Sequence, residues 1–72
     1  MTEKEKLALL EEAMELDEGT LSIDDVLEDY PEWDSISALS LIALVDEKFG
    51  KILDGQTVKK FEKVSDALAV ME

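Results

Sequence analysis

Hydrophobic residues recur at three- and four-residue steps from Leu7 to Leu16, which is the spacing of one face of an amphipathic helix. Thr2 is placed to cap this helix, and Glu5 is placed to complete a reciprocal capping box. Gly19 is the expected stop. The glutamates between the apolar positions are expected at the surface: Glu11, Glu12 and Glu15.

A second helical pattern runs from Ser35 to Phe49, with Asp34 or Ser35 as its cap and Gly50 as its end. A rotation of about 100° per residue divides it into two faces. The core stripe consists of Ala38, Leu41, Ile42, Val45 and Phe49. The opposite side carries Ile36, Ala43, Ser40 and Glu47, with Leu39 on its flank. We therefore expect an exposed apolar spot with an acidic rim near Ser35, which is either ordinary surface or a docking site.

The connection from Asp17 to Asp34 has no steady period, and such long structureless connections are uncommon in compact domains. We therefore expect Ile23 and Val26-Leu27 to pack into the core through a helical turn that begins near Ser22.

The remainder of the chain predicts a short helical stretch between Asp54 and Phe61, then a last helix capped by Ser65. No segment alternates as a strand does. The predicted fold is all-α: a small antiparallel bundle of three main helices plus one short helix, with a long packed loop between helices one and two. The predicted organisation is one domain, residues 1–72.

The charge of the chain limits the kinds of partner that it can bind, because 19 acidic against 7 basic residues give a net charge of −12. Such a chain repels nucleic acid and anionic membranes and attracts basic protein surfaces. No apolar run is long enough for a membrane span, and no basic leader with a following apolar run opens the chain. We therefore expect a cytoplasmic protein.

Several chemistries are excluded by residue types that are missing. The chain has no histidine and no cysteine, so it has no Ser-His or Cys-His pair and no usual zinc site. The acidic clusters lack the spacing of an EF-hand, and three isolated glycines cannot form a phosphate-binding loop. We predict no metal site and no catalytic residue, and we expect that the chain is not an enzyme.

Ser35 then becomes the most informative residue, because it lies at the start of a helix. Free N–H groups and the positive end of the helix dipole favour an attached phosphate group at that place. A plain helix cap is the alternative reading of the same serine.

The run Asp34-Ser35-Ile36, at the head of a leucine-rich helix ending in Phe49-Gly50, resembles the acyl carrier proteins. The resemblance extends over nearly the whole chain, including its size, its acidity, the order of the helices and the closing Val64-Ser65-Asp66-Ala67-Leu68.

This resemblance implies that a phosphopantetheinyl transferase attaches 4′-phosphopantetheine to Ser35, and that acyl groups are carried on this cofactor as thioesters. For Asp34, which matches the aspartate before the serine in these proteins, the resemblance implies a role in holding magnesium when the transferase docks; a plain helix cap is the alternative role. The positions that match partner contacts are Ile36, Leu39, Ala43 and Glu47. An acyl pocket between helices two and three would involve Leu41, Ile42, Val58 and Phe61, which are otherwise ordinary core.

The expected partners are acyl-loading and acyl-transferring enzymes with basic docking patches, and the expected state is a monomer. Trp33, directly before Asp34, departs from the pattern of fatty-acid carriers, as do Ser37 and Ser40. These departures favour specialised acylation, such as surface-polysaccharide or secondary-metabolite assembly, although fatty acid and polyketide biosynthesis stay among the pathways that the resemblance implies. Two alternatives remain: a peptidyl or aminoacyl carrier, and a non-carrier acidic helical adaptor for a basic protein.

Overall fold

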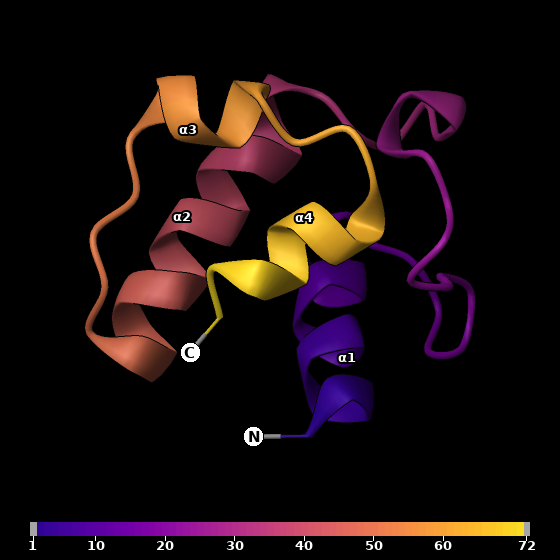
Figure 1. The fold of residues 1–72 in the computed structure, drawn as a ribbon, viewed down its shortest axis with the longest axis horizontal. Coiled ribbons are helices and arrows are strands. Elements are labelled where there is room, and N and C mark those ends of the chain that lie inside the picture. The colour runs from indigo at the N-terminus through magenta and orange to yellow at the C-terminus, as the bar shows by residue number, and fades with distance from the viewer. Residues whose placement is uncertain (1, 72) are drawn as a thin grey trace.

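The computed structural model describes residues 2–71, which are mainly helical and contain no strand. Four α-helices follow one another within this range (Figure 1). Their bounds are α1 Glu3–Ala13, α2 Ser35–Phe49, α3 Gly55–Lys59 and α4 Val64–Ala69, and a 3-10 turn η1 covers Leu27–Asp29. The prediction of a helical chain without strands is confirmed for these residues.

Helix α1 begins as its sequence predicts. The Thr2 hydroxyl accepts a hydrogen bond from the Glu5 N–H at 3.2 Å, and the Glu5 carboxylate accepts one from the Thr2 N–H at 3.1 Å. These bonds lower the pKa of Glu5. The reciprocal pair satisfies two of the N–H groups that every helix start leaves free.

The end of α1 differs from the prediction, because the helix stops at Ala13 and not near Gly19. Glu15 adopts a left-handed backbone with φ 58°, and the Leu16 N–H donates to the Glu11 carbonyl at 2.8 Å. This geometry is a Schellman motif, which is usually formed with glycine. Here a glutamate occupies the left-handed position, so the sequence carries no glycine signal at the true end.

The segment between α1 and α2 packs against the rest of the protein, with Leu21 and Leu27 buried and Ile23 half-buried. A turn does begin at Ser22, where the Asp25 N–H donates to the Ser22 carbonyl at 3.0 Å, but this turn is not helical. The helical turn begins at Leu27, and Val26 is exposed. The segment is fixed by its main chain. Three backbone hydrogen bonds join it to Glu62 and to the first residues of α4: Leu27 N–H to Glu62 O at 2.9 Å, Val64 N–H to Asp25 O at 2.9 Å and Ser65 N–H to Ile23 O at 3.1 Å.

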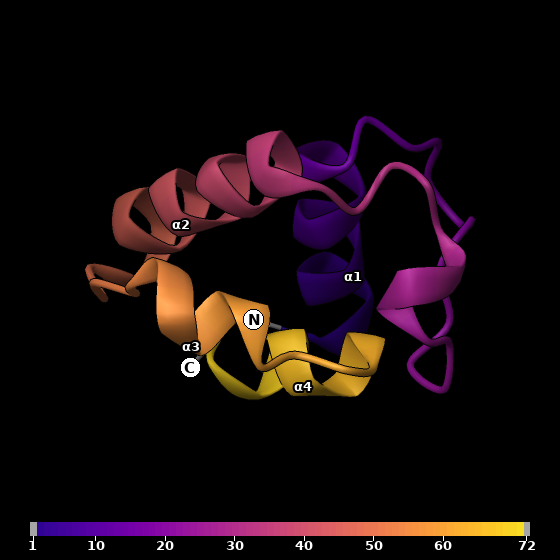
Figure 2. The same ribbon diagram turned by 90° about the horizontal axis from the view of Figure 1, so that it is seen from above.

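The core lies between α2 on one side and α3 and α4 on the other, with α1 alongside (Figure 2). Its largest fully buried side chains are Leu10, Leu27, Leu41, Val45, Val58, Val64 and Met71. The prediction that Glu11 lies at the surface is wrong, because Glu11 is only 3% exposed. Its carboxylate accepts a hydrogen bond from the Leu21 N–H at 2.9 Å. Glu11 therefore joins α1 to the loop.

The last helix is shorter than expected and starts differently. Ser65 lies inside α4 and does not cap it. Instead the Asp66 carboxylate accepts from the N–H groups of Glu62 and Lys63, both at 3.0 Å. These two bonds hold the pKa of Asp66 below its ordinary value of 3.8. The described chain thus has two long helices, α1 and α2, and two short ones.

Candidate functional site

The first turn of α2 is built by Asp34 and Ser37. The Asp34 carboxylate accepts from the Ser37 N–H at 2.9 Å, while the Ser37 hydroxyl accepts from the Asp34 N–H at 2.8 Å. The same hydroxyl lies 2.9 Å from the Asp34 carbonyl, to which it donates. Ser37 is 4% exposed. The hydroxyl of Ser37 is therefore committed to the helix start and inaccessible from solvent.

Ser35 occupies the first position of the same helix but has a different environment, because its side chain is exposed. Its hydroxyl makes no hydrogen bond within residues 2–71. A helix leaves its first four N–H groups without helical partners, and the capping pair satisfies those of Asp34 and Ser37. The N–H groups of Ser35 and Ile36 remain, so α2 offers a free hydroxyl beside two free backbone donors.

An apolar cavity of about 430 Å³ lies beside Ser35, between α2, α3 and the segment that leads into α2. Its apolar wall consists of Trp33, Ala38, Leu39, Ile42, Val58 and Phe61. Polar groups also line it: Glu28, Asp34, Ser35 and Lys59. The predicted acyl-pocket positions Ile42, Val58 and Phe61 thus meet at this cavity. Leu41 does not line it and is fully buried in the core.

The predicted partner residues lie on the surface of α2. Ile36 is 73% exposed and Leu39 is 66% exposed, and Ala43 and Glu47 are also exposed. Ile36 and Leu39 lie in the first turns, close to Ser35. Glu47 lies near the other end of the helix, ~18 Å along the axis from Ser35 at 1.5 Å per residue. The structure therefore groups Ile36 and Leu39 with the site and separates Glu47 from it.

Three residues of the site could not be placed by sequence alone. Glu28 and Lys59 come from η1 and α3, and only the folded arrangement brings them to the cavity. Trp33 was visible in the sequence as a neighbour of Asp34, but its position in the cavity wall depends on the path of the loop. In the sequence, Glu28 appears only as part of an acidic run and Trp33 only as a lone aromatic residue.

The loop before Trp33 is held by a tyrosine-aspartate pair. The Tyr30 hydroxyl donates to the Asp25 carboxylate at 2.7 Å, and the Ser22 N–H donates to the same carboxylate oxygen at 2.9 Å. The bond to Tyr30 is the largest cause of a lowered pKa at Asp25, and the bond to Asp25 is the largest cause of a raised pKa at Tyr30. The Trp33 N–H then donates to the Tyr30 carbonyl at 3.0 Å. The pair thus supports the backbone that carries Trp33.

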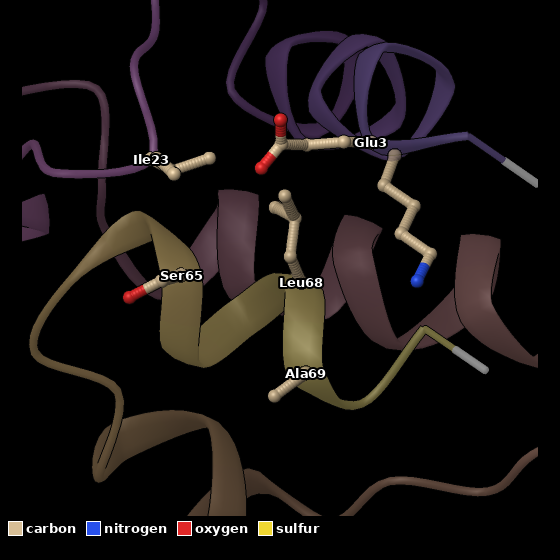
Figure 3. Close-up of a pocket in the computed structure, with 6 residues that line it drawn as sticks. Glu3, Ile23, Ser65, Leu68 and Ala69 are labelled. Carbon is tan, nitrogen blue, oxygen red and sulfur yellow. The ribbon is translucent and has the colours of Figure 1, made fainter.

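A second hollow lies away from Ser35, between the start of α1, the loop and α4, and has a volume of about 270 Å³ (Figure 3). In this view Leu68 points toward Glu3 and Ile23, and the Ser65 hydroxyl points away from them. Lys6 and Ala69 complete its lining. It contains none of the predicted site residues and has a single lysine and a single carboxylate, so we assign it no chemistry.

Neither a metal cluster nor a membrane-spanning element accompanies this site. No group of three or more Asp or Glu side chains within residues 2–71 is arranged to hold a metal ion. In the same range, no helix has both the length and the apolar character needed to cross a bilayer. Comparisons with protein-family models, curated proteins and solved structures found no match.

Proposed function

We propose that this protein is an acyl carrier protein that carries acyl intermediates on a 4′-phosphopantetheine group attached to Ser35. One observation carries the proposal: Ser35 presents an exposed, unengaged hydroxyl at the head of α2 and at the edge of an apolar cavity. Ser37, two residues away, has its hydroxyl bonded and buried. Of these two serines in the first turn of α2, Ser35 is therefore available for attachment, whereas Ser37 has a structural role.

The residues around Ser35 fit a phosphodiester. In the proposed attachment, the Ser35 oxygen forms a bond to the phosphorus next to the pantetheine of coenzyme A. The bond from that phosphorus to the bridging oxygen breaks, adenosine 3′,5′-bisphosphate leaves, and the hydroxyl proton passes to a base of the transferase. The N–H groups of Ser35 and Ile36 and the dipole of α2 favour the resulting anion. Asp34 is the carboxylate available to a magnesium ion held by the docked transferase.

When bound, the cofactor supplies the thiol that the sequence lacks, and an acyl group is held on it as a thioester. The cavity between α2 and α3 is the proposed site for the acyl chain. Ile42, Val58 and Phe61 supply apolar surface there, and burial of a chain against such surface contributes about 25 cal/mol per Å². Because Ser35 lines the same cavity, the cofactor attached there would begin at the cavity that is proposed to take the acyl chain.

We infer that the four helices form the small antiparallel bundle expected for this class, with the segment between α1 and α2 as its long packed loop. The packing of α2 on α1 and α3, and of α1 on α4, supports this arrangement. Burial of Leu21 and Leu27 supports the packed loop. The two short helices, α3 and α4, complete the bundle.

The proposed partners are the transferase and acyl-loading or acyl-transferring enzymes with basic docking patches. Ile36 and Leu39 form an exposed apolar pair beside Ser35. The chain from Leu7 to Glu47 contains no lysine, so the surroundings of this pair attract basic surfaces. Ala43 and Glu47 would extend the contact along α2. We further propose a monomer that works in the cytoplasm, in fatty acid, polyketide or specialised surface-polysaccharide acylation.

Mass spectrometry tests the attachment. The protein is incubated with coenzyme A and a phosphopantetheinyl transferase of broad specificity, and we expect the mass to rise by one phosphopantetheinyl group. Ser35→Ala should stay unmodified, whereas Ser37→Ala should still be modified. An unmodified wild-type protein would favour a helical adaptor, and modification of Ser35→Ala would move the site to another serine. Loading assays with acyl and aminoacyl donors then separate an acyl carrier from a peptidyl carrier.

A further inference from the structure

Trp33 is the largest side chain in the wall of the cavity beside Ser35. It is half-buried, and it is contributed by the segment before α2, whereas the other apolar wall residues belong to α2, to α3 or to the turn after α3. An aromatic ring gives a large apolar contact at a low cost in side-chain entropy. Trp33 therefore offers contact area to anything that enters this cavity from Ser35.

The backbone of Trp33 is fixed on both sides. Its own N–H donates to the Tyr30 carbonyl at 3.0 Å, and the N–H of the next residue, Asp34, donates to the Ser37 hydroxyl at 2.8 Å. Tyr30 is in turn bonded to Asp25 at 2.7 Å. A side chain on a fixed backbone is better suited to select a ligand by shape than one on a mobile loop.

The charged groups that line the cavity are Glu28, Asp34 and Lys59, two carboxylates against one ammonium group. The whole chain adds a net charge of −12. The N–H groups of Ser35 and Ile36 favour an anion at the head of α2, but a carboxylate at the far end of a chain that enters from there would add a third negative charge inside the cavity, and its desolvation against the apolar wall would be costly. An uncharged chain meets neither penalty.

We propose that Trp33 is the cargo-selecting residue of this carrier: acyl chains pack against its indole, and the cavity thereby favours uncharged apolar acyl groups over groups with a second carboxylate. This inference rests on the proposed function, which supplies the attachment to Ser35. The binding preference itself belongs to the cavity and can be measured without attachment.

The first experiment uses the unmodified protein and the fluorescence of Trp33, which is the only tryptophan in the chain. It is titrated in phosphate buffer, which supplies an anion to the free N–H groups of Ser35 and Ile36, with 1-octanol and with octanoate, two chains of equal length that differ in charge. We expect a saturable blue shift with 1-octanol and binding of octanoate that is about tenfold weaker. An emission spectrum that does not change with 1-octanol would overturn the proposal.

Three variants make this experiment specific. Ala38→Leu adds bulk to the cavity wall and should weaken 1-octanol binding, whereas Ile52→Ala, at a position 87% exposed and outside the cavity, should leave it unchanged. Glu28→Gln removes one carboxylate and should strengthen octanoate binding severalfold without affecting 1-octanol. Equal effects of Ala38→Leu and Ile52→Ala, or no effect of Glu28→Gln on octanoate, would contradict the proposed cavity or the proposed charge selection.

The second experiment uses the protein loaded at Ser35 with octanoyl or succinyl phosphopantetheine, and it follows thioester cleavage by hydroxylamine. We expect protection of the octanoyl form alone, and about tenfold loss of that protection in Trp33→Ala. Circular dichroism checks that the variant is folded, and Ala38→Leu provides a second test that leaves Trp33 intact. Equal cleavage of both thioesters would overturn the proposal. Failure of attachment to Ser35 would contradict the proposed function alone, because the titration still decides the role of Trp33.

Discussion

The Ser37 hydroxyl and the Asp34 carboxylate each accept a hydrogen bond from the other residue's backbone N–H, at 2.8 and 2.9 Å. This reciprocal pair fixes the start of α2, and it explains why two serines of one helical turn differ in availability. Ser35 lies between the two capping residues and takes no part in their bonds.

We expect Asp34→Ala and Ser37→Ala each to lower the free energy of unfolding by about 1 kcal/mol, because each removes a helix cap. Urea denaturation followed by circular dichroism measures the loss. Ser35→Ala is the matched control and should stay within about 0.5 kcal/mol of the wild type. A loss at Ser35 as large as that at Ser37 would show that the Ser35 hydroxyl has a structural role.

Glu11 gives a second stability prediction, because its buried carboxylate accepts a hydrogen bond from the Leu21 N–H at 2.9 Å. Glu11→Ala leaves this N–H without its partner, so we expect a loss of about 1–3 kcal/mol in the free energy of unfolding. Glu11→Gln keeps an acceptor oxygen and should lose less. Glu12→Ala, at an exposed position of the same helix, is the control for helix propensity. Equal losses at positions 11 and 12 would contradict the role assigned to Glu11.

The Tyr30 to Asp25 bond predicts opposite pH dependences for its two partners. Because the pKa of Tyr30 is raised from 10.0, its contribution to stability is present below pH 10.0 and is lost as the pH rises through the folded pKa. Because the pKa of Asp25 is lowered from 3.8, its contribution is present above pH 3.8 and is lost as the pH falls through the folded pKa.

Ultraviolet absorbance can follow the ionisation of Tyr30 directly, since Tyr30 is the only tyrosine in the chain. We expect its titration midpoint above pH 10.0 in the wild type, and a downward shift toward 10.0 in Asp25→Asn, which removes the charged acceptor. Asp29→Asn retains the hydrogen bond and should cause a smaller shift. An unperturbed midpoint in the wild-type protein would mean that this bond does not persist in solution.

The net charge of −12 predicts a salt dependence of stability. Like charges repel in the folded state, and ions screen them, so the melting temperature should rise with sodium chloride and with magnesium chloride. Replacing exposed carboxylates in the loop, for example with Glu18→Gln, should raise the melting temperature at low salt and reduce the salt effect. A melting temperature independent of ionic strength would indicate that the charges are balanced locally.

Much of α2 could be predicted from its sequence, because its period, its cap and its terminal glycine all agree. Gly50 adopts the left-handed backbone with φ 65° that its position predicts. The end of α1 could not be found in the same way. Glu15 takes the left-handed conformation because the bond from Leu16 N–H to Glu11 O closes the helix there, and local preference would not place a glutamate in that conformation.

The start of α4 also could not be predicted from the sequence. Ser65 has the residue type of a cap, but the acceptor is Asp66, whose carboxylate reaches back to two backbone N–H groups. At the candidate site, Ser35 and Asp34 were evident because helix caps are local. Lys59 was not, since it is brought to the cavity only by the packing of α3 against α2.

The three main-chain bonds between the loop and the start of α4 have a consequence for the order in which the protein opens. A helix of six residues is too short to be stable alone, so α4 depends on its attachments. Since Leu27, Val64 and Ser65 donate these bonds across the two segments, their amides should exchange with deuterium through one shared opening. An irregular loop and a helix far from it in sequence would then unfold together as one cooperative unit.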